Sequence, residues 1–123
     1  MKRRTLLLAT AGLWLVAQPA AASLAPGERE RIERLLKAME RQTDVNFERN
    51  GRLASARDAV RFLRAKWERH GSDVDSAEGF IDRIASRSST SGRPYRVCPK
   101  ASACVEAGPW LRSLLQQADE ARP

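Results

Sequence analysis

Apolar side chains recur at helical spacing in four segments of this chain, which cover residues 28–42, 55–69, 76–85 and the part from residue 108 onward. Each pattern predicts an amphipathic helix that buries one stripe against a shared core. The apolar positions are, in order, Ile32, Leu35, Leu36 and Met39; Ala56, Ala59, Val60, Leu63 and Trp67; Ala77, Phe80, Ile81 and Ile84; and Trp110, Leu111, Leu114, Leu115 and Ala118.

Residues that favour helix ends mark the limits of these segments. Ser55 and Asp58 resemble a capping box with an acid at its fourth position, which predicts the start of the second helix. Gly71 is suited to end that helix, and Ser76 is the expected N-cap of the third. Gly108-Pro109 is expected to begin the last helix, with Pro109 at its first position, because the N–H that proline lacks would have no partner there.

Two parts of the chain lack helical periodicity. Residues 43–54 contain Phe47 and the turn dipeptide Asn50-Gly51, and we expect a loop or a short extended segment there. Residues 94–98 favour a strand, and residues 104–106 can run back beside it. Because two strands alone are marginally stable, this hairpin must pack on helices. The predicted fold is α+β and mainly α, with about four helices and one β-hairpin between the third and fourth.

Both cysteines of the chain, Cys98 and Cys104, fall in this predicted hairpin. A disulfide between them would close a short loop, which is worth roughly 2 kcal/mol in the chain-entropy model. Their spacing is not the C-x-x-C of a redox enzyme, and two thiols with a single histidine, His70, make a poor zinc site. We therefore expect a disulfide that pins the hairpin, no metal and no cofactor.

The first 22 residues have the composition of a cleavable leader. Three basic residues precede an apolar run that is too short to span a bilayer, and three alanines end the segment. This pattern predicts a secretory signal peptide cleaved after Ala22, with a retained anchor as the alternative. The rest of the chain, residues 23–123, is predicted to be one small domain in the periplasm or outside a bacterial cell.

The charge balance changes when the leader is removed. The whole chain has 22 Lys and Arg against 15 Asp and Glu. The leader contains three of these basic residues and no acidic one, so its removal leaves 19 against 15, a net charge of +4. Outside the cytoplasm this favours an acidic protein, a cell-wall polymer or anionic headgroups over nucleic acid. Arg57, Arg61 and Arg64 share one side of the second helix and form a candidate basic surface. Phe62 lies off the apolar stripe, which predicts a second buried face or an exposed ring beside that surface.

Few side chains suit catalysis. A nucleophile activated by histidine would need His70, whose position favours a role at a helix end. Glu78 and Asp82 are spaced i, i+4 and could pair two carboxylates for glycoside hydrolysis, although acids at this spacing are usually surface charges. We expect a protein that is not an enzyme, with a carboxylate-based hydrolase as the alternative.

The segment between the third helix and the hairpin, SRSSTSGRPY over residues 86–95, is the candidate binding loop. Its candidate residues are Arg87, Ser88, Ser89, Ser91, Gly92, Arg93 and Tyr95. It could bind an anion with its arginines and backbone N–H groups. It could also inhibit an enzyme, since SGRPY is similar to the S-G-R-x-Y element of certain periplasmic lysozyme inhibitors. The third interpretation is structural, with hydroxyl groups that satisfy the backbone where the helix unwinds.

A broader resemblance covers nearly the whole chain after the leader. Its residues are FERNG (47–51), then Ser55, Asp58, Ala59, Leu63, Arg64 and Lys66, then AEGFIDRIASRSS (77–89), SGRPY (91–95) and WL (110–111). In this order they resemble a family of small exported bacterial proteins that carry a domain of unknown function. The family pattern commonly has Tyr where Ala54 stands and His where Phe62 stands. An activity that used those two side chains would be missing here.

The resemblance implies that one constellation joins the Asn-Gly turn to the loop 86–95. Its members are Asn50, Gly51, Ser86, Ser88, Ser89, Gly92, Pro94 and Tyr95. We expect the two segments to lie side by side. The expected function is that of a non-enzymatic binding protein of the cell envelope, which acts through the loop and the basic surface on an envelope protein or cell-wall component. Inhibition of a cell-wall hydrolase and binding of a small anion are the alternatives.

Overall fold

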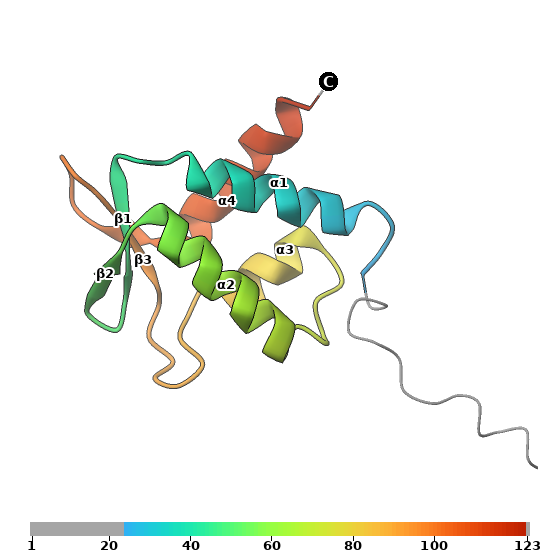
Figure 1. Cartoon of the computed structure of the whole chain (residues 1–123), viewed down its shortest axis with the longest axis horizontal. Helices are drawn as coiled ribbons and strands as arrows, with labels where there is room; N and C mark the ends of the chain where they lie inside the picture. The colour runs from blue at the N-terminus through green and yellow to red at the C-terminus, as the bar shows by residue number, and fades with distance from the viewer. Residues whose placement is uncertain (1–23, 123) are drawn as a thin grey trace, which may run out of the picture.

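The computed structural model describes residues 24–122, and the predicted signal peptide lies outside this range. Its elements are α1 (Glu28–Glu40), β1 (Val45–Arg49), β2 (Arg52–Ala54), α2 (Ala56–His70), α3 (Ala77–Phe80), the π-helix η3 (Ile81–Ala85), β3 (Arg96–Pro99), β4 (Val105–Glu106) and α4 (Ala107–Glu120). Figure 1 shows the sheet at one end of the packed helices. The predicted fold class, α+β and mainly α with a disulfide-linked hairpin before the last helix, is confirmed.

The starts predicted at Ser55 and Ser76 are built as expected, whereas α4 begins at Ala107 after its N-cap Glu106, so Pro109 is its third residue and not its first. The hydroxyl of Ser55 accepts a hydrogen bond from the Asp58 N–H at 3.1 Å, and that of Ser76 accepts one from the Gly79 N–H at 2.9 Å. Each bond satisfies one of the N–H groups that a helix start leaves without a partner. No helix within residues 24–122 has both the length and the apolar character needed to cross a membrane.

The third helix departs from ideal geometry at its end. After one α-helical turn it widens into η3, and the Ser86 hydroxyl donates to the carbonyl of Ile81 at 2.6 Å. A π-helical turn takes more residues than an α-helical one, and the hydroxyl of Ser86 bonds a carbonyl at the point where the helix stops. The loop 86–95 therefore starts from a fixed position.

The segment 43–54 is more ordered than the sequence predicted. It forms the hairpin β1–β2, in which Arg49 pairs with Arg52 and the turn between them is Asn50-Gly51. Both turn residues have positive φ, 52° and 85°, as the turn of a two-residue hairpin requires. The expectation of a loop or a short extended segment missed this pairing, although its turn dipeptide was correctly placed.

A single antiparallel sheet joins this hairpin to the predicted one, in the order β2-β1-β3-β4. Strand β1 pairs with β3 from Val45 opposite Pro99 to Glu48 opposite Arg96. Alternate residues of β1 and β3 point into the core, which they share with the apolar stripes of the helices. The disulfide-linked hairpin is thus half of a four-stranded sheet as well as a support for helices.

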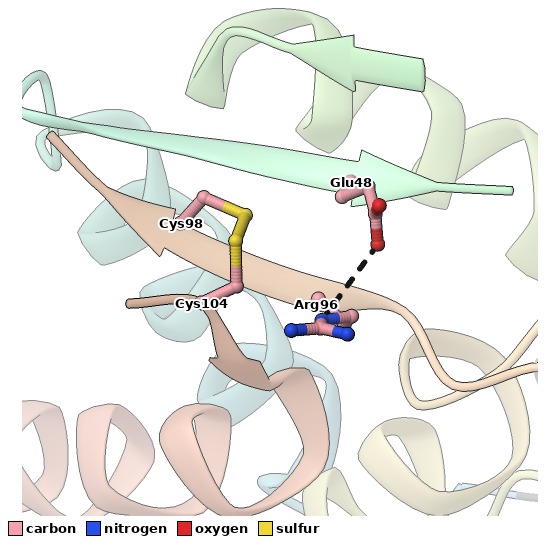
Figure 2. The surroundings of a disulfide bond; sticks show 4 residues. All are labelled: Glu48, Arg96, Cys98 and Cys104. Carbon is pink, nitrogen blue, oxygen red and sulfur yellow. Dashed lines mark ion pairs between the residues drawn. A yellow bond between two sulfur atoms is a disulfide. The ribbon is translucent and has the colours of Figure 1, made fainter. Parts of the chain in front are cut away.

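The face of β1 and β3 away from the core is polar. It carries the disulfide between Cys98 and Cys104 and, beside it, Glu48 and Arg96, whose charged groups lie 3.8 Å apart (Figure 2). The predicted disulfide is confirmed. It links β3 to the start of β4 and so restrains the short edge strand.

Candidate functional site

The Asn-Gly turn and the loop 86–95 are in contact. The side-chain N–H of Asn50 donates to the Ser88 hydroxyl at 3.2 Å, and the Ser91 hydroxyl donates to the side-chain oxygen of Asn50 at 2.7 Å. One side chain of the β1–β2 turn therefore holds a loop that lies about 40 positions later in the chain. The adjacency implied by the resemblance is confirmed.

The loop also satisfies its own backbone. The N–H groups of Thr90 and Ser91 donate to the Ser88 hydroxyl, and the N–H of Arg93 donates to the Ser91 hydroxyl. The N–H of Gly92, which has a φ of 74°, donates to the Ser88 carbonyl. The donors that would surround an anion are therefore already bonded inside the loop, and the structural interpretation of its hydroxyl groups holds.

The candidate residues of the loop divide into an exposed and a buried group. The exposed residues are Arg87, Ser89, Ser91, Gly92 and Arg93, while Ser88 and Tyr95 are buried. Arg87 donates through its guanidinium to the Gly92 carbonyl at 3.2 Å, which ties the two sides of the loop together. Tyr95 belongs to the core, unlike a side chain offered to a partner.

A buried lysine supports the loop from below. Lys66 of α2 is only 3% exposed, and its ammonium donates to the carbonyl of Arg87 at 2.8 Å and to the Tyr95 hydroxyl at 2.9 Å. Burial, with a smaller effect from the positive charge of Arg49, lowers the pKa of Lys66 to about 8. Burial likewise raises the pKa of Tyr95.

Sequence reasoning missed the role of this lysine. Lys66 follows Ala59 by seven residues and Leu63 by three, so it lies on the apolar stripe of its helix. That position was the available signal, because a lysine on a buried stripe needs polar partners.

An apolar pocket of about 170 Å³ lies beside Tyr95, between the β1–β2 hairpin and α2. Its walls include Phe47, Ala54, Phe62 and Leu63. Ala54 and Phe62 occupy the positions at which the sequence resemblance leads us to expect Tyr and His. Phe62 is half-buried, with its ring edge-on to Tyr95 and the guanidinium of Arg49 stacked 4.1 Å above its centre. It therefore forms neither a fully buried second face of α2 nor a fully exposed ring beside the basic surface.

The candidate basic surface on α2 is largely neutralised by acids. Arg61 pairs with Asp58 at 3.1 Å on the same helix, and Arg64 forms a two-pronged pair with Glu33 of α1 at 2.8 and 3.0 Å. The Arg64 guanidinium lowers the pKa of the Glu33 carboxyl. Arg57 is exposed. Two of the three arginines therefore serve local pairing and interhelical contact.

The two carboxylates considered for hydrolysis are bound to different arginines. Glu78 accepts two hydrogen bonds from Arg31, at 2.8 and 3.0 Å, and Asp82 pairs with Arg112. The bonds from Arg31 hold the pKa of Glu78 below its usual value, whereas a general acid needs a raised one. His70 is exposed at the end of α2, as expected.

No cluster of potential metal ligands occurs within the described range 24–122. The fold and site define a small α+β domain in which Asn50 and the buried Lys66 hold the loop 86–95 through hydrogen bonds. The chain belongs to a family of unknown function, DUF5329, whose model matches residues 26–119. This confirms the predicted domain of unknown function.

One relative extends this comparison. Over 81 residues the chain is 40% identical to the uncharacterized protein YfeK of Salmonella typhimurium strain LT2. The alignment covers 66% of this chain and 68% of that protein. No solved structure matches the chain.

Proposed function

We propose that this protein is a non-enzymatic binding protein of the bacterial cell envelope and that it recognises an envelope protein or cell-wall component through the loop 86–95. The observation that carries the proposal is the double anchoring of this loop, by Asn50 at its tip and by Lys66 at its base. A loop already held in one conformation loses little entropy on binding, which favours affinity.

The exposed side of the loop indicates the chemistry of the partner. Arg87, Ser89 and Arg93 face solvent, so the loop offers two cations and hydroxyl groups on a fixed frame. An acidic surface of a protein or polymer complements this better than a single small anion, because the backbone N–H groups that would enclose an anion are occupied.

Two further observations support the remaining parts of the proposal. The disulfide between Cys98 and Cys104 suits an oxidising compartment, as the predicted signal peptide does. The arginine pairing of Glu78 and Asp82 suits a binding protein better than a carboxylate-based hydrolase.

Affinity capture from envelope extracts tests the proposal, with Arg93→Glu as the loop variant. Arg122→Glu is the matched control, because it makes the same charge change near the C-terminus, which Figure 1 shows at the other end of the molecule from the loop. We expect a partner that the wild type and Arg122→Glu retain and that Arg93→Glu loses. The same partners on all three proteins would refute binding through the loop. Inhibition of purified lysozymes that Arg93→Glu abolishes would identify the partner as a cell-wall hydrolase.

A further inference from the structure

The apolar pocket between the β1–β2 hairpin and α2 has the size of a single small group. Its volume of about 170 Å³ is close to that of the engineered apolar cavity, about 150 Å³, known to bind benzene. Phe47, Ala54, Phe62 and Leu63 supply apolar walls, while the exposed residues Arg49 and Asp58 mark the side that opens to solvent. One aromatic ring or one branched aliphatic group fits this space, and a lipid chain does not.

The charges at the opening favour an anion. Arg49 is the only basic residue among the described residues that line the pocket. The two acids there have other cationic neighbours: Asp58 pairs with Arg61 at 3.1 Å, and Glu48 lies 3.8 Å from Arg96.

Arg49 itself has a free face for a ligand. Its guanidinium stacks on the ring of Phe62, and within residues 24–122 it forms no ion pair. Stacking fixes the plane of a guanidinium and leaves its N–H groups pointing outward, in the geometry that binds a carboxylate with two hydrogen bonds.

We propose that this pocket binds an aromatic or branched apolar group that carries a carboxylate, with the apolar group against Phe47 and Phe62 and the carboxylate paired with Arg49. A free aryl or branched-chain acid has this chemistry, and so does the C-terminal residue of a peptide. The site uses no exposed residue of the loop 86–95, so it stands or falls independently of the binding role proposed for that loop.

Phenylacetate is the probe for a free acid, and its binding is measured by ligand-observed NMR and calorimetry. We expect a dissociation constant in the millimolar range, as is usual for a ligand of this size, on the order of 1 mM. Benzyl alcohol, which keeps the ring and lacks the carboxylate, is expected to bind about tenfold more weakly.

Three variants test the assigned contacts. Arg49→Gln is expected to weaken phenylacetate about tenfold and to leave benzyl alcohol unchanged. Arg52→Gln, at an exposed position across the same turn, is the matched control and is expected to change neither. Ala54→Leu fills the pocket and should abolish binding of both probes. If Ala54→Leu fails to fold, the comparison of Arg49→Gln with Arg52→Gln still tests the proposal.

A peptide arm separates the two sources of the ligand. A tripeptide that ends in Phe is compared with its C-terminally amidated form. Binding of the free form about tenfold tighter than phenylacetate, and dependent on Arg49, supports a protein C-terminus as the natural ligand, and equal or weaker binding supports a free acid. The proposal is overturned if neither probe binds at about 20 mM, or if Arg52→Gln weakens phenylacetate as much as Arg49→Gln does.

Discussion

The buried ammonium of Lys66 makes a prediction about stability at alkaline pH. In the folded protein its pKa is about 8, whereas an unfolded chain has the ordinary value of 10.5. Between these values the unfolded chain binds more protons than the folded protein, so the free energy of unfolding must rise with pH. This is opposite to the effect of Tyr95, whose raised pKa lowers stability once the pH exceeds about 10.

The size of the effect follows from the difference between the two pKa values of Lys66. The full difference corresponds to roughly 3 kcal/mol, of which about 2 kcal/mol is realised between pH 7 and pH 10. The two hydrogen bonds of the ammonium, to the Arg87 carbonyl and the Tyr95 hydroxyl, favour the charged form and reduce this value.

Urea unfolding between pH 7 and pH 10, followed by tryptophan fluorescence, measures the effect. We expect Lys66→Met to remove the rise in stability, because a methionine has a similar length and no proton to lose. Lys37→Met, at an exposed position of α1, is the control and should keep the wild-type dependence on pH. If the wild type and Lys66→Met respond equally to pH, Lys66 has an ordinary pKa and the argument from its burial is wrong.

Three further predictions concern the connections between elements. Arg31→Gln breaks the pairs that join α1 to Glu78 and to α4, and should cost about 2 kcal/mol at pH 7 in urea unfolding. Because Arg31 lowers the pKa of Glu78, this contribution must fade as the pH falls below about 4, and a loss that persists at pH 2 would contradict it. Asn50→Gly keeps the positive φ of the turn and removes its bonds to the loop 86–95, so hydrogen exchange of the loop amides should accelerate; unchanged exchange would show that Asn50 does not hold the loop. The double variant Cys98→Ser, Cys104→Ser should lose about 2 kcal/mol, and equal stability with and without the disulfide would disprove its role.

Sequence reasoning succeeded where the deciding contacts are local. The N-cap at Ser55 is closed by an N–H three residues away, and the disulfide closes within a short hairpin. The prediction that Arg64 contributes to a basic surface was incomplete, because Glu33, the acid that pairs with this arginine, lies 31 residues earlier on another helix. The contact between Asn50 and the loop 86–95 was expected only through the family resemblance, since neither segment by itself indicates the other.

The sequence alone determined the helices, the starts of the second and third, the hairpin with its disulfide and the position of the loop 86–95 between them. These features depend on periodicity, capping and short chain closures, all of which act over a few residues. Only the tertiary structure decided that β1 pairs with β3, that Lys66 is buried beneath the loop, and that Arg49, which has no ion pair among residues 24–122, stacks on Phe62 beside an apolar pocket. Each of these depends on segments brought together from distant parts of the chain, where burial and pairing are set by the neighbours that folding supplies.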